Sequence, residues 1–454
     1  MPAKKIACLG GGSLYFLRAI PDLLLSPELA GSEIVLYDLD AEKARRMAAM
    51  GARLAQAASG RFRVRAAGEL ADAVDGADFA LSSIGGSGAE IGDNVYASAT
   101  HAADIAIPAR YGIHQIVGDT CGPAGMMMGL RSVPAYLAIC REMEKRCPDV
   151  VLLNHSNPMA VLCRAMRKHT SINVVGICHG VQIGICHAAR LLGVPADELE
   201  CLWVGTNHYY WFTQVRRRGV DVYPDLMRRV RQEPPGAGET MSALLSRAYG
   251  YQIVYPEDDH VVEFTPFLPQ CPSGPEALPY ALAERAREFN APAQRAAEPG
   301  DPALVRQRFF GQYQEMLDAA ELPAARDDSV GAEGVGAILG AMAEGRRRVC
   351  IANVANRGAI PNLPDHAEVE VEAVTESRGV RPIHMGDAPL VLKGLLEKRF
   401  VWQELVADAA VKGDRNLALQ ALLVDEMAIW PDKAEAMLDE LLEASRPLLP
   451  AFFA

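Results

Sequence analysis

The first half of the chain alternates short apolar runs with longer stretches of helical periodicity. Apolar or β-branched runs predict strands at residues 5–9, 33–37, 62–66, 79–83, 150–153 and 174–177. Helical patterns lie between them at residues 14–25, 41–58, 156–168 and 181–192. Strands that are apolar along their whole length are typical of a parallel sheet covered on both faces. The first half is therefore predicted to form a Rossmann-type doubly wound parallel sheet.

After about residue 195 this alternation ends. Mixed strand and helix patterns follow, with turn-rich breaks at 233–236 and 298–302, and a long helical tail extends from about Asn416 to Ser445. We expect two domains, a doubly wound domain over residues 1–195 and an α+β domain over residues 196–454.

Composition narrows the class of protein. Among the 454 residues, 57 acidic side chains exceed 45 basic ones, for a net charge of −12, which argues against nucleic acid or an anionic membrane as partner. The apolar runs are shorter than the roughly 20 residues that a membrane-spanning helix needs. Ten cysteines show no paired spacing, and the first five residues lead directly into the first strand rather than into a signal-like apolar region. We expect a cytoplasmic enzyme with reduced thiols.

A glycine-rich turn follows the first predicted strand. Residues 10–13, Gly-Gly-Gly-Ser, open the first helix, where backbone amides can approach a pyrophosphate. Tyr15 occupies the position of the third glycine of the usual fingerprint. Asp38, at the end of the second strand, could accept both ribose hydroxyls of NAD and would repel the phosphate of NADP. The alternative is a tight turn with Asp40 as a helix cap. We predict an NAD site formed by Gly10, Gly12, Ser13, Asp38 and Ser83.

Three further polar clusters of the first half are expected to gather at the ends of predicted strands. Residues 118–123 contain Asp119 and precede a helix that carries Arg131, residues 154–158 read Asn-His-Ser-Asn-Pro, and residues 178–180 read Cys-His-Gly. One such cluster is usually a helix cap, but three at one edge of an open α/β sheet indicate a ligand site. His208 lies among aromatic residues in the second half, where a lone histidine is more often a core residue. Its spacing from Cys178 does not by itself establish a metal site.

Eight short blocks occur in an order that resembles one enzyme family. They read GGGS, LYDLD, GDTCGPAG, NHSNP, CHG, GTNH, DHVVEF and NRGAIPNLP, and they extend over most of the chain. Together they resemble glycoside hydrolase family 4, the NAD- and divalent-metal-dependent glycosidases. The Cys-His-Gly block and the DHVVEF segment resemble the α-galacturonidase and α-glucuronidase subgroup more than the 6-phosphoglycosidases.

The resemblance implies a fold related to lactate and malate dehydrogenases and a divalent metal, usually manganese. It also implies a mechanism outside the two-carboxylate scheme of most glycosidases. NAD⁺ removes hydride from C3 of the sugar, the metal holds the C2 and C3 oxygens, and a base takes the acidified C2 proton. An acid then helps the C1 leaving group depart, water adds back and the hydride returns.

Particular residues follow from the same resemblance. It places the metal on Cys178 and His208 and makes His179 the general acid. The base is assigned to Asp258, with Tyr255 and Asp259 in reserve. Sugar contacts are assigned to Asp119 and Asn154, and Asn157 is placed near the nicotinamide or the sugar. Apart from the resemblance, a uronic acid substrate needs a cation for its carboxylate, for which Arg131 and Arg357 are candidates and Lys393 is a more distant one.

Three properties of the predicted site remain open. A helix-face salt bridge is the alternative for Arg131. A thiolate and an imidazole intrinsically suit zinc, cobalt or nickel better than manganese, and oxidation of Cys178 would abolish metal binding. The family also suggests a homodimer or homotetramer.

Several other functions are compatible with some of these residues. Within the family, the alternative substrates are neutral α-glucosides or α-galactosides, followed by phosphorylated sugars. An NAD-dependent 2-hydroxyacid dehydrogenase would use the same fold but would leave Cys178 and His208 without a role. A protein that binds NAD without turnover would not need the acid, base and metal candidates.

Overall fold

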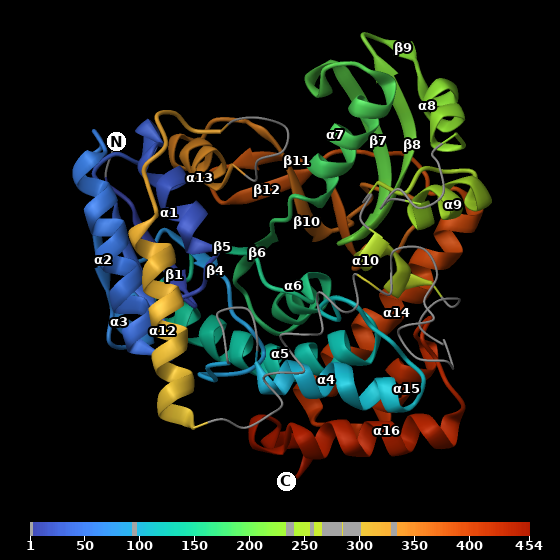
Figure 1. Cartoon of the computed structure of the whole chain (residues 1–454). Coiled ribbons are helices and arrows are strands. Elements are labelled where there is room, and N and C mark those ends of the chain that lie inside the picture. The colour runs from blue at the N-terminus through green and yellow to red at the C-terminus, as the bar shows by residue number, and fades with distance from the viewer. Residues whose placement is uncertain are drawn as a thin grey trace.

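The computed structural model describes residues 3–92, 98–232, 240–254, 258–265, 284, 301–327 and 334–454. Figure 1 shows a large sheet flanked by helices, with a smaller sheet beside it. None of the helices within these residues is long and apolar enough to cross a membrane.

Six parallel strands form one side of the large sheet, from its edge strand β3 inward, in the spatial order β3-β2-β1-β4-β5-β6. Each lies within one residue of the predicted strand, and β4 and β5 are buried along their whole length. This order is that of the dinucleotide-binding fold, so the predicted Rossmann-type sheet is confirmed. The strands are β1 (Lys5–Leu9), β2 (Glu33–Tyr37), β3 (Arg63–Ala66), β4 (Phe79–Ser82), β5 (Val151–Asn154) and β6 (Asn173–Gly176).

Helices connect and flank these strands (Figure 1). Asp40 caps α2 by accepting the backbone N–H groups of Glu42 and Lys43, as the alternative reading of that residue expected. The connecting helices are α1 (Phe16–Leu24), α2 (Ala41–Ala57), α3 (Leu70–Val74), α4 (Ala99–Arg110), α5 (Gly122–Arg146), α6 (Met159–His169) and α7 (Gly180–Leu192).

Three strands from the second half extend the large sheet beyond β6. They are β10 (Val349–Ala355), β11 (Glu368–Glu376) and β12 (Gly379–Pro382), and β10 runs antiparallel to β6. A Cβ atom at Gly176 would lie 2.8 Å from Cβ of Asn353, so glycine allows this close approach. The large sheet therefore contains residues from both sides of the predicted boundary at 195, and the division into two domains stays a prediction.

The smaller sheet consists of β7 (Leu199–Thr206), β8 (Tyr209–Arg217) and β9 (Val220–Asp221). Its aromatic residues Trp203, Tyr210 and Trp211 are completely buried. β7 packs against β11, which joins the two sheets. The helices that follow are α8 (Tyr223–Val230), α9 (Thr240–Tyr249) and α10 (Asp258–Val261).

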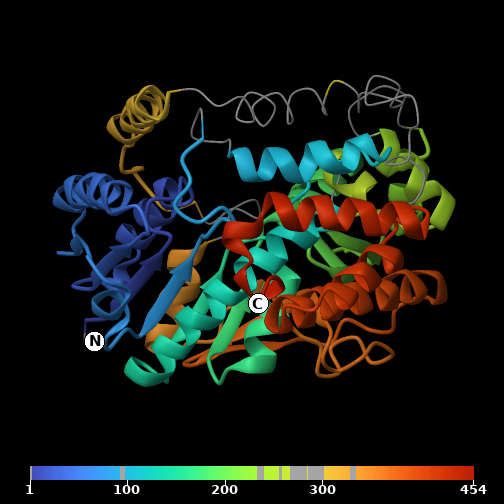
Figure 2. The ribbon, with the colours of Figure 1, turned by 90° about the horizontal axis from the view of Figure 1, so that it is seen from below.

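The C-terminal part is helical, and the long tail predicted from about Asn416 is two helices. The break precedes Pro431, whose ring fits only the first turn of a helix. Figure 2 shows α16 running beside α4, and the two helices are in contact. The remaining helices are α12 (Pro302–Asp318), α13 (Val335–Glu344), α14 (Leu390–Lys412), α15 (Arg415–Val424) and α16 (Pro431–Ala444).

Candidate active site

The glycine-rich turn lies tightly against the ends of β2 and β4. Gly10 has φ +69°, and a Cβ atom there would lie 2.1 Å from the carbonyl oxygen of Ser83. At Gly12, a Cβ atom would lie 2.4 Å from Cβ of Lys43. Both positions therefore require glycine, because any side chain would push the turn off its neighbours.

The predicted nucleotide-binding residues meet at this turn. Asp38 Oδ2 accepts the Gly12 backbone N–H at 2.9 Å, and the hydroxyl oxygens of Ser13 and Ser83 lie 2.8 Å apart. Tyr313, from the distant helix α12, donates its hydroxyl to the Gly12 carbonyl oxygen at 2.7 Å. The arrangement fits the cradle of a dinucleotide: small residues, a helix N-terminus and a carboxylate at the end of the second strand.

Cys178 and His208 come together although they lie thirty residues apart. Cys178 follows β6, and His208 lies in the two-residue turn between β7 and β8. Cys178 Sγ lies 3.4 Å from His208 Nε2, and both residues are buried. The Gly180 N–H, at the start of α7, points at the same sulfur from 3.4 Å. A helix N-terminus favours the thiolate, which is the form that binds metal.

A short hydrogen-bond chain orients the ring of His208. Thr120 Oγ1 donates to Asp119 and lies 2.9 Å from His208 Nδ1. Because the Thr120 hydrogen is given to Asp119, Nδ1 carries the proton of the ring and Nε2 keeps its lone pair toward Cys178. Burial and the neighbouring His260 lower the pKa of His208 to about 3, so the ring is neutral, as a metal ligand must be.

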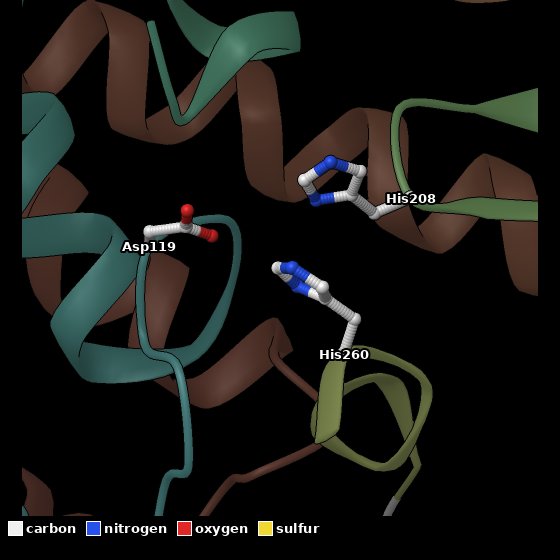
Figure 3. Close-up of side chains that lie close together, drawn as sticks. All are labelled: Asp119, His208 and His260. Carbon is white, nitrogen blue, oxygen red and sulfur yellow. The ribbon is translucent and has the colours of Figure 1, made fainter. Parts of the chain in front are cut away.

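Asp119 and His260 complete the cluster with His208. One ligand atom from each of the three lies within 4.8 Å of the others, and Figure 3 shows the three side chains pointing toward one another from three separate elements. Asp119 precedes α5, and His260 lies in α10 with its ring centroid 4.3 Å from that of His208. Two imidazoles and a carboxylate that face one another, with the Cys178 thiol beside His208, are donor types that fit a divalent transition metal.

Glu263 holds the segment that leads to Asp119. Its Oε1 accepts the backbone N–H groups of Ile116, Val117 and Gly118 at 2.8–3.0 Å, and the residue is buried. Burial and the nearby Asp119 raise the pKa of Glu263 to about 8, and the three N–H groups act against that rise. Glu263 thus fixes the loop on one side of the cluster by bonding its backbone.

Models of known families match almost the whole chain. Residues 5–193 match the model of the family 4 glycosyl hydrolases, and residues 203–428 match the model of the C-terminal domain of the same family. The chain belongs to glycosyl hydrolase family 4. The resemblance predicted from the eight sequence blocks is therefore confirmed, and the protein is a glycoside hydrolase.

Curated relatives of this family 4 hydrolase are named for several sugars. An α-galacturonidase of Bacillus subtilis is 29% identical and covers 97% of both chains. An α-galactosidase of the same organism is 27% identical over 99% of this chain and 100% of the relative. An α-glucosidase of Erwinia rhapontici is 27% identical over 98% and 99%. The family is thus shared while the named substrate differs.

Solved structures show the same fold. The structure of lplD from Bacillus subtilis aligns with a TM-score of 0.79 at 26% identity, over 97% of this chain and 100% of that one. A 6-phospho-α-glucosidase from gut microorganisms, solved in complex with NAD and Mn²⁺, aligns with a TM-score of 0.77 at 23% identity, over 99% of each chain. A lactate dehydrogenase from a deep-sea metagenome aligns with a TM-score of 0.51 at 12% identity over 90% of this chain and 100% of that one, so the expected dehydrogenase-like fold is present.

Two predicted residues of the family 4 site lie beside the buried pair of Cys178 and His208. His179 caps α7 and is exposed, whereas Cys178 directly before it is buried. Asn157 Nδ2 donates to Asp119 Oδ2 at 2.8 Å. His179 as general acid and Asn157 as a site residue therefore stay predictions that the geometry allows.

The sugar contact predicted for Asn154 is not supported. Its side chain is completely buried, where Oδ1 accepts the hydroxyls of Tyr136 and Ser82 and Nδ2 donates to the Ser156 carbonyl oxygen. These bonds join β4, β5 and α5. Asn154 therefore ties the sheet together instead of reaching a ligand.

Two of the three candidate cations for a uronate carboxylate are engaged in ion pairs. Arg131 is buried in an ion pair with Asp104, the salt bridge that was its alternative role. Lys393 pairs with Glu397. Arg357 lies in the turn after β10, where its backbone N–H donates to the Asp365 carbonyl oxygen, and its charge acts on the buried carboxyl group of Glu368.

The predicted base lies on the segment that carries His260. Asp258 begins α10, but its side chain and the whole of Tyr255 lie outside the described residues. Thr120 and Glu263 had no assigned role in the sequence, although each stands in a family block. His260 was also missed, and its position between Asp259 and Glu263 in DHVVEF was the available signal.

Proposed function

We propose that this family 4 hydrolase is an NAD- and manganese-dependent glycosidase that acts on α-galacturonides or related uronides. The observation that carries the cofactor dependence is the 3.4 Å approach of Cys178 Sγ to His208 Nε2, with the histidine held neutral and correctly protonated. The bound NAD and Mn²⁺ of a structural neighbour support both cofactors. The α-galacturonidase relatives, at 26–29% identity, support the sugar.

The residues of this chain divide the chemistry between them. When bound, NAD supplies reversible oxidation of a sugar carbon, and the metal supplies Lewis acidity beside the neighbouring C–H bond. Cys178 and His208 would hold the cation, and Gly10, Gly12, Ser13, Asp38 and Ser83 would hold the dinucleotide. Asp119 would bind a sugar hydroxyl. Thr120 and Asn157 each donate a hydrogen bond to one of its oxygens, and its carboxylate lies within the cluster with His208 and His260.

Two segments that carry histidines provide the candidate acid and base for proton transfer. His179 would protonate the leaving oxygen, because it is exposed and directly follows the buried Cys178 in the chain. The base would come from α10, either Asp258 as the resemblance implies or His260, whose ring reaches the cluster. Each positioned acid or base of this kind contributes about 10²–10⁴-fold in rate.

The test is a panel of nitrophenyl glycosides. Purified protein would be incubated with 4-nitrophenyl α-galacturonide, α-glucuronide, α-galactoside and α-glucoside, with and without NAD⁺ and Mn²⁺, under a thiol reductant. We expect nitrophenol release that needs both cofactors without net NADH, fastest on a uronide. NADH formed from a hydroxy acid, with no nitrophenol released, would instead support a dehydrogenase.

A neutral α-galactoside or α-glucoside is the second candidate. It is favoured by the α-galactosidase and α-glucosidase relatives, whose identity is close to that of the α-galacturonidases, and by the engagement of Arg131 and Lys393 in ion pairs. The same panel separates the two, since a neutral-sugar enzyme would cleave the galactoside or glucoside faster than either uronide. A cytoplasmic homodimer or homotetramer remains the expected assembly, which light scattering on the purified chain would test.

A further inference from the structure

A buried group of polar side chains connects the two segments that carry the proposed metal ligands Cys178 and His208. It consists of Asn207, Asn353 and Glu370, which we call the strut. All three side chains are 0–1% exposed, and they come from the β7–β8 turn and from strands β10 and β11. A carboxyl group this deeply buried is costly unless its bonds stabilise something.

One end of the strut holds the turn that carries His208. Asn207 Nδ2 donates to Glu370 Oε2 at 3.2 Å. Trp203 Nε1, on the strand leading into the turn, donates to the Glu370 carbonyl oxygen at 2.7 Å. His208 has φ +62°, a left-handed conformation that costs energy for a non-glycine residue and persists only where its surroundings fix it.

The other end of the strut meets the strand that leads to Cys178. Glu370 is directly opposite Asn353 in the antiparallel pair of β11 and β10, and Asn353 is opposite Gly176 in β6. Cys178 lies two residues past Gly176. Asn353, Glu370 and Asn207 therefore form a continuous path of neighbours between the backbones that carry Cys178 and His208.

Glu370 is not among the residues assigned above to the nucleotide or the metal. Its carboxyl group points from β11 to Asn207 in the β7–β8 turn. We propose that Glu370 is a positioning residue that sets the separation of Cys178 and His208, through its bond to Asn207, and thereby the affinity for the divalent metal. The inference rests on the proposed metal site at these two residues. Burial raises the pKa of Glu370 to about 7, and the hydrogen bonds with Asn207 and Asn353 act against that rise.

Glu368 provides a matched control on the same strand and face. It is also buried, but it pairs with Arg167 of α6 at 2.9 Å instead of with the hairpin turn. Glu370→Met removes the acceptor for Asn207 at nearly constant size, and Glu370→Gln keeps an acceptor oxygen. Glu368→Met removes a carboxylate of the same burial without touching Asn207.

The experiment is calorimetric titration of Mn²⁺ into the reduced full-length protein, with NAD⁺ affinity measured on each variant as a check of folding. We expect Glu370→Met to weaken Mn²⁺ binding by about 10- to 100-fold, as for other groups that support metal ligands. Glu370→Gln should stay within about threefold of wild type, and Glu368→Met should leave Mn²⁺ affinity unchanged. Asn207→Ala, which removes the same bond from the other side, replaces Glu370→Met if that variant loses NAD⁺ binding.

The outcomes separate the inference from the function on which it rests. Unchanged Mn²⁺ affinity in Glu370→Met, or an equal loss in Glu368→Met or Glu370→Gln, overturns the role of Glu370. Cys178→Ser is measured in the same series. If it binds Mn²⁺ like the wild type, the metal site itself is wrong. If it abolishes binding while Glu370→Met does not, the strut alone is wrong.

Discussion

The glycine-rich turn and the cluster around Cys178 differ in how the chain builds them. The turn is formed by residues 10–13, Asp38 and Ser83, which follow three strands that are neighbours in the sheet. The cluster draws Asp119, Cys178, His208 and His260 from four elements, two of them outside the parallel sheet. The first site follows from the βα rhythm of one sheet, whereas the second depends on where the β7–β8 hairpin and α10 dock against that sheet.

This difference implies that the two sites should fail independently. A change at the turn affects backbone contacts to a pyrophosphate, and a change in the cluster affects a cation and the proton transfers beside it. Separate titrations of NAD⁺ and Mn²⁺ measure the two sites on the same variant. The variants below are ordered by the size of the effect that we expect.

Replacing Cys178 with serine should have the largest effect. A serine hydroxyl is not ionised at neutral pH, so the variant loses an anionic ligand and the Lewis acidity that depends on it. A metal supplies several kcal/mol of charge stabilisation, so we expect glycosidase activity to fall by about 10³-fold. Calorimetry should show Mn²⁺ binding lost and NAD⁺ affinity within about twofold of wild type. Full activity and metal content in this variant would refute the assignment of Cys178.

Gly10→Ala tests the opposite site. The new Cβ would lie 2.1 Å from the Ser83 carbonyl oxygen at a φ of +69°, so the turn must move. Strain of this kind costs about 1–3 kcal/mol, and we expect NAD⁺ affinity to fall by about 10- to 100-fold. Mn²⁺ affinity should be unchanged. A parallel loss of both ligands would show that the two sites are one cooperative unit. Gly85→Ala, where a Cβ meets nothing within 4 Å, is the control.

Sequence reasoning succeeded where local pattern and structure coincide. The six parallel strands could be placed within one residue, because each is a short apolar run bounded by polar turns. The pairing of Cys178 with His208 came only from the family resemblance, because the approach of two sheets leaves no spacing in the sequence. The family resemblance assigns Asn154 to the sugar, but its side chain accepts the hydroxyls of Tyr136 and Ser82 inside the fold, and no local pattern shows such a contact.

Thr120→Val should have a moderate effect on the metal site alone. Valine keeps the shape of threonine but breaks the hydrogen bonds to His208 and Asp119, so the ring of His208 loses the partner that fixes its proton. Groups of this kind typically contribute 10- to 100-fold to metal affinity, and we expect about tenfold here because His208 remains neutral through burial. Titration with Mn²⁺ measures the affinity of this variant. The control is Thr375→Val, which alters a buried threonine of β11. Equal Mn²⁺ affinity in Thr120→Val and wild type would show that burial alone orients the ring.

Tyr313→Phe should have the smallest effect, and it tests whether the glycine-rich turn is as local as the sequence makes it. The Tyr313 hydroxyl reaches the Gly12 carbonyl oxygen from α12, some 300 residues away in the chain. Burial raises the pKa of Tyr313, so the hydroxyl is a neutral donor. One such bond contributes about 0.5–1.5 kcal/mol, equivalent to about a two- to tenfold loss of NAD⁺ affinity if the turn depends on it.

The control for Tyr313→Phe is Tyr223→Phe. The Tyr223 hydroxyl also donates to a backbone carbonyl oxygen at 2.7 Å, but Tyr223 begins α8 and its acceptor, Phe212, lies in the smaller sheet. We expect Tyr223→Phe to leave NAD⁺ affinity unchanged. If both variants bind NAD⁺ as tightly as wild type, the turn needs no support from α12 and its local construction is complete. If Tyr313→Phe alone binds NAD⁺ more weakly, the nucleotide site also depends on a contact between distant segments. The two sites would then differ only in how strongly each depends on such contacts.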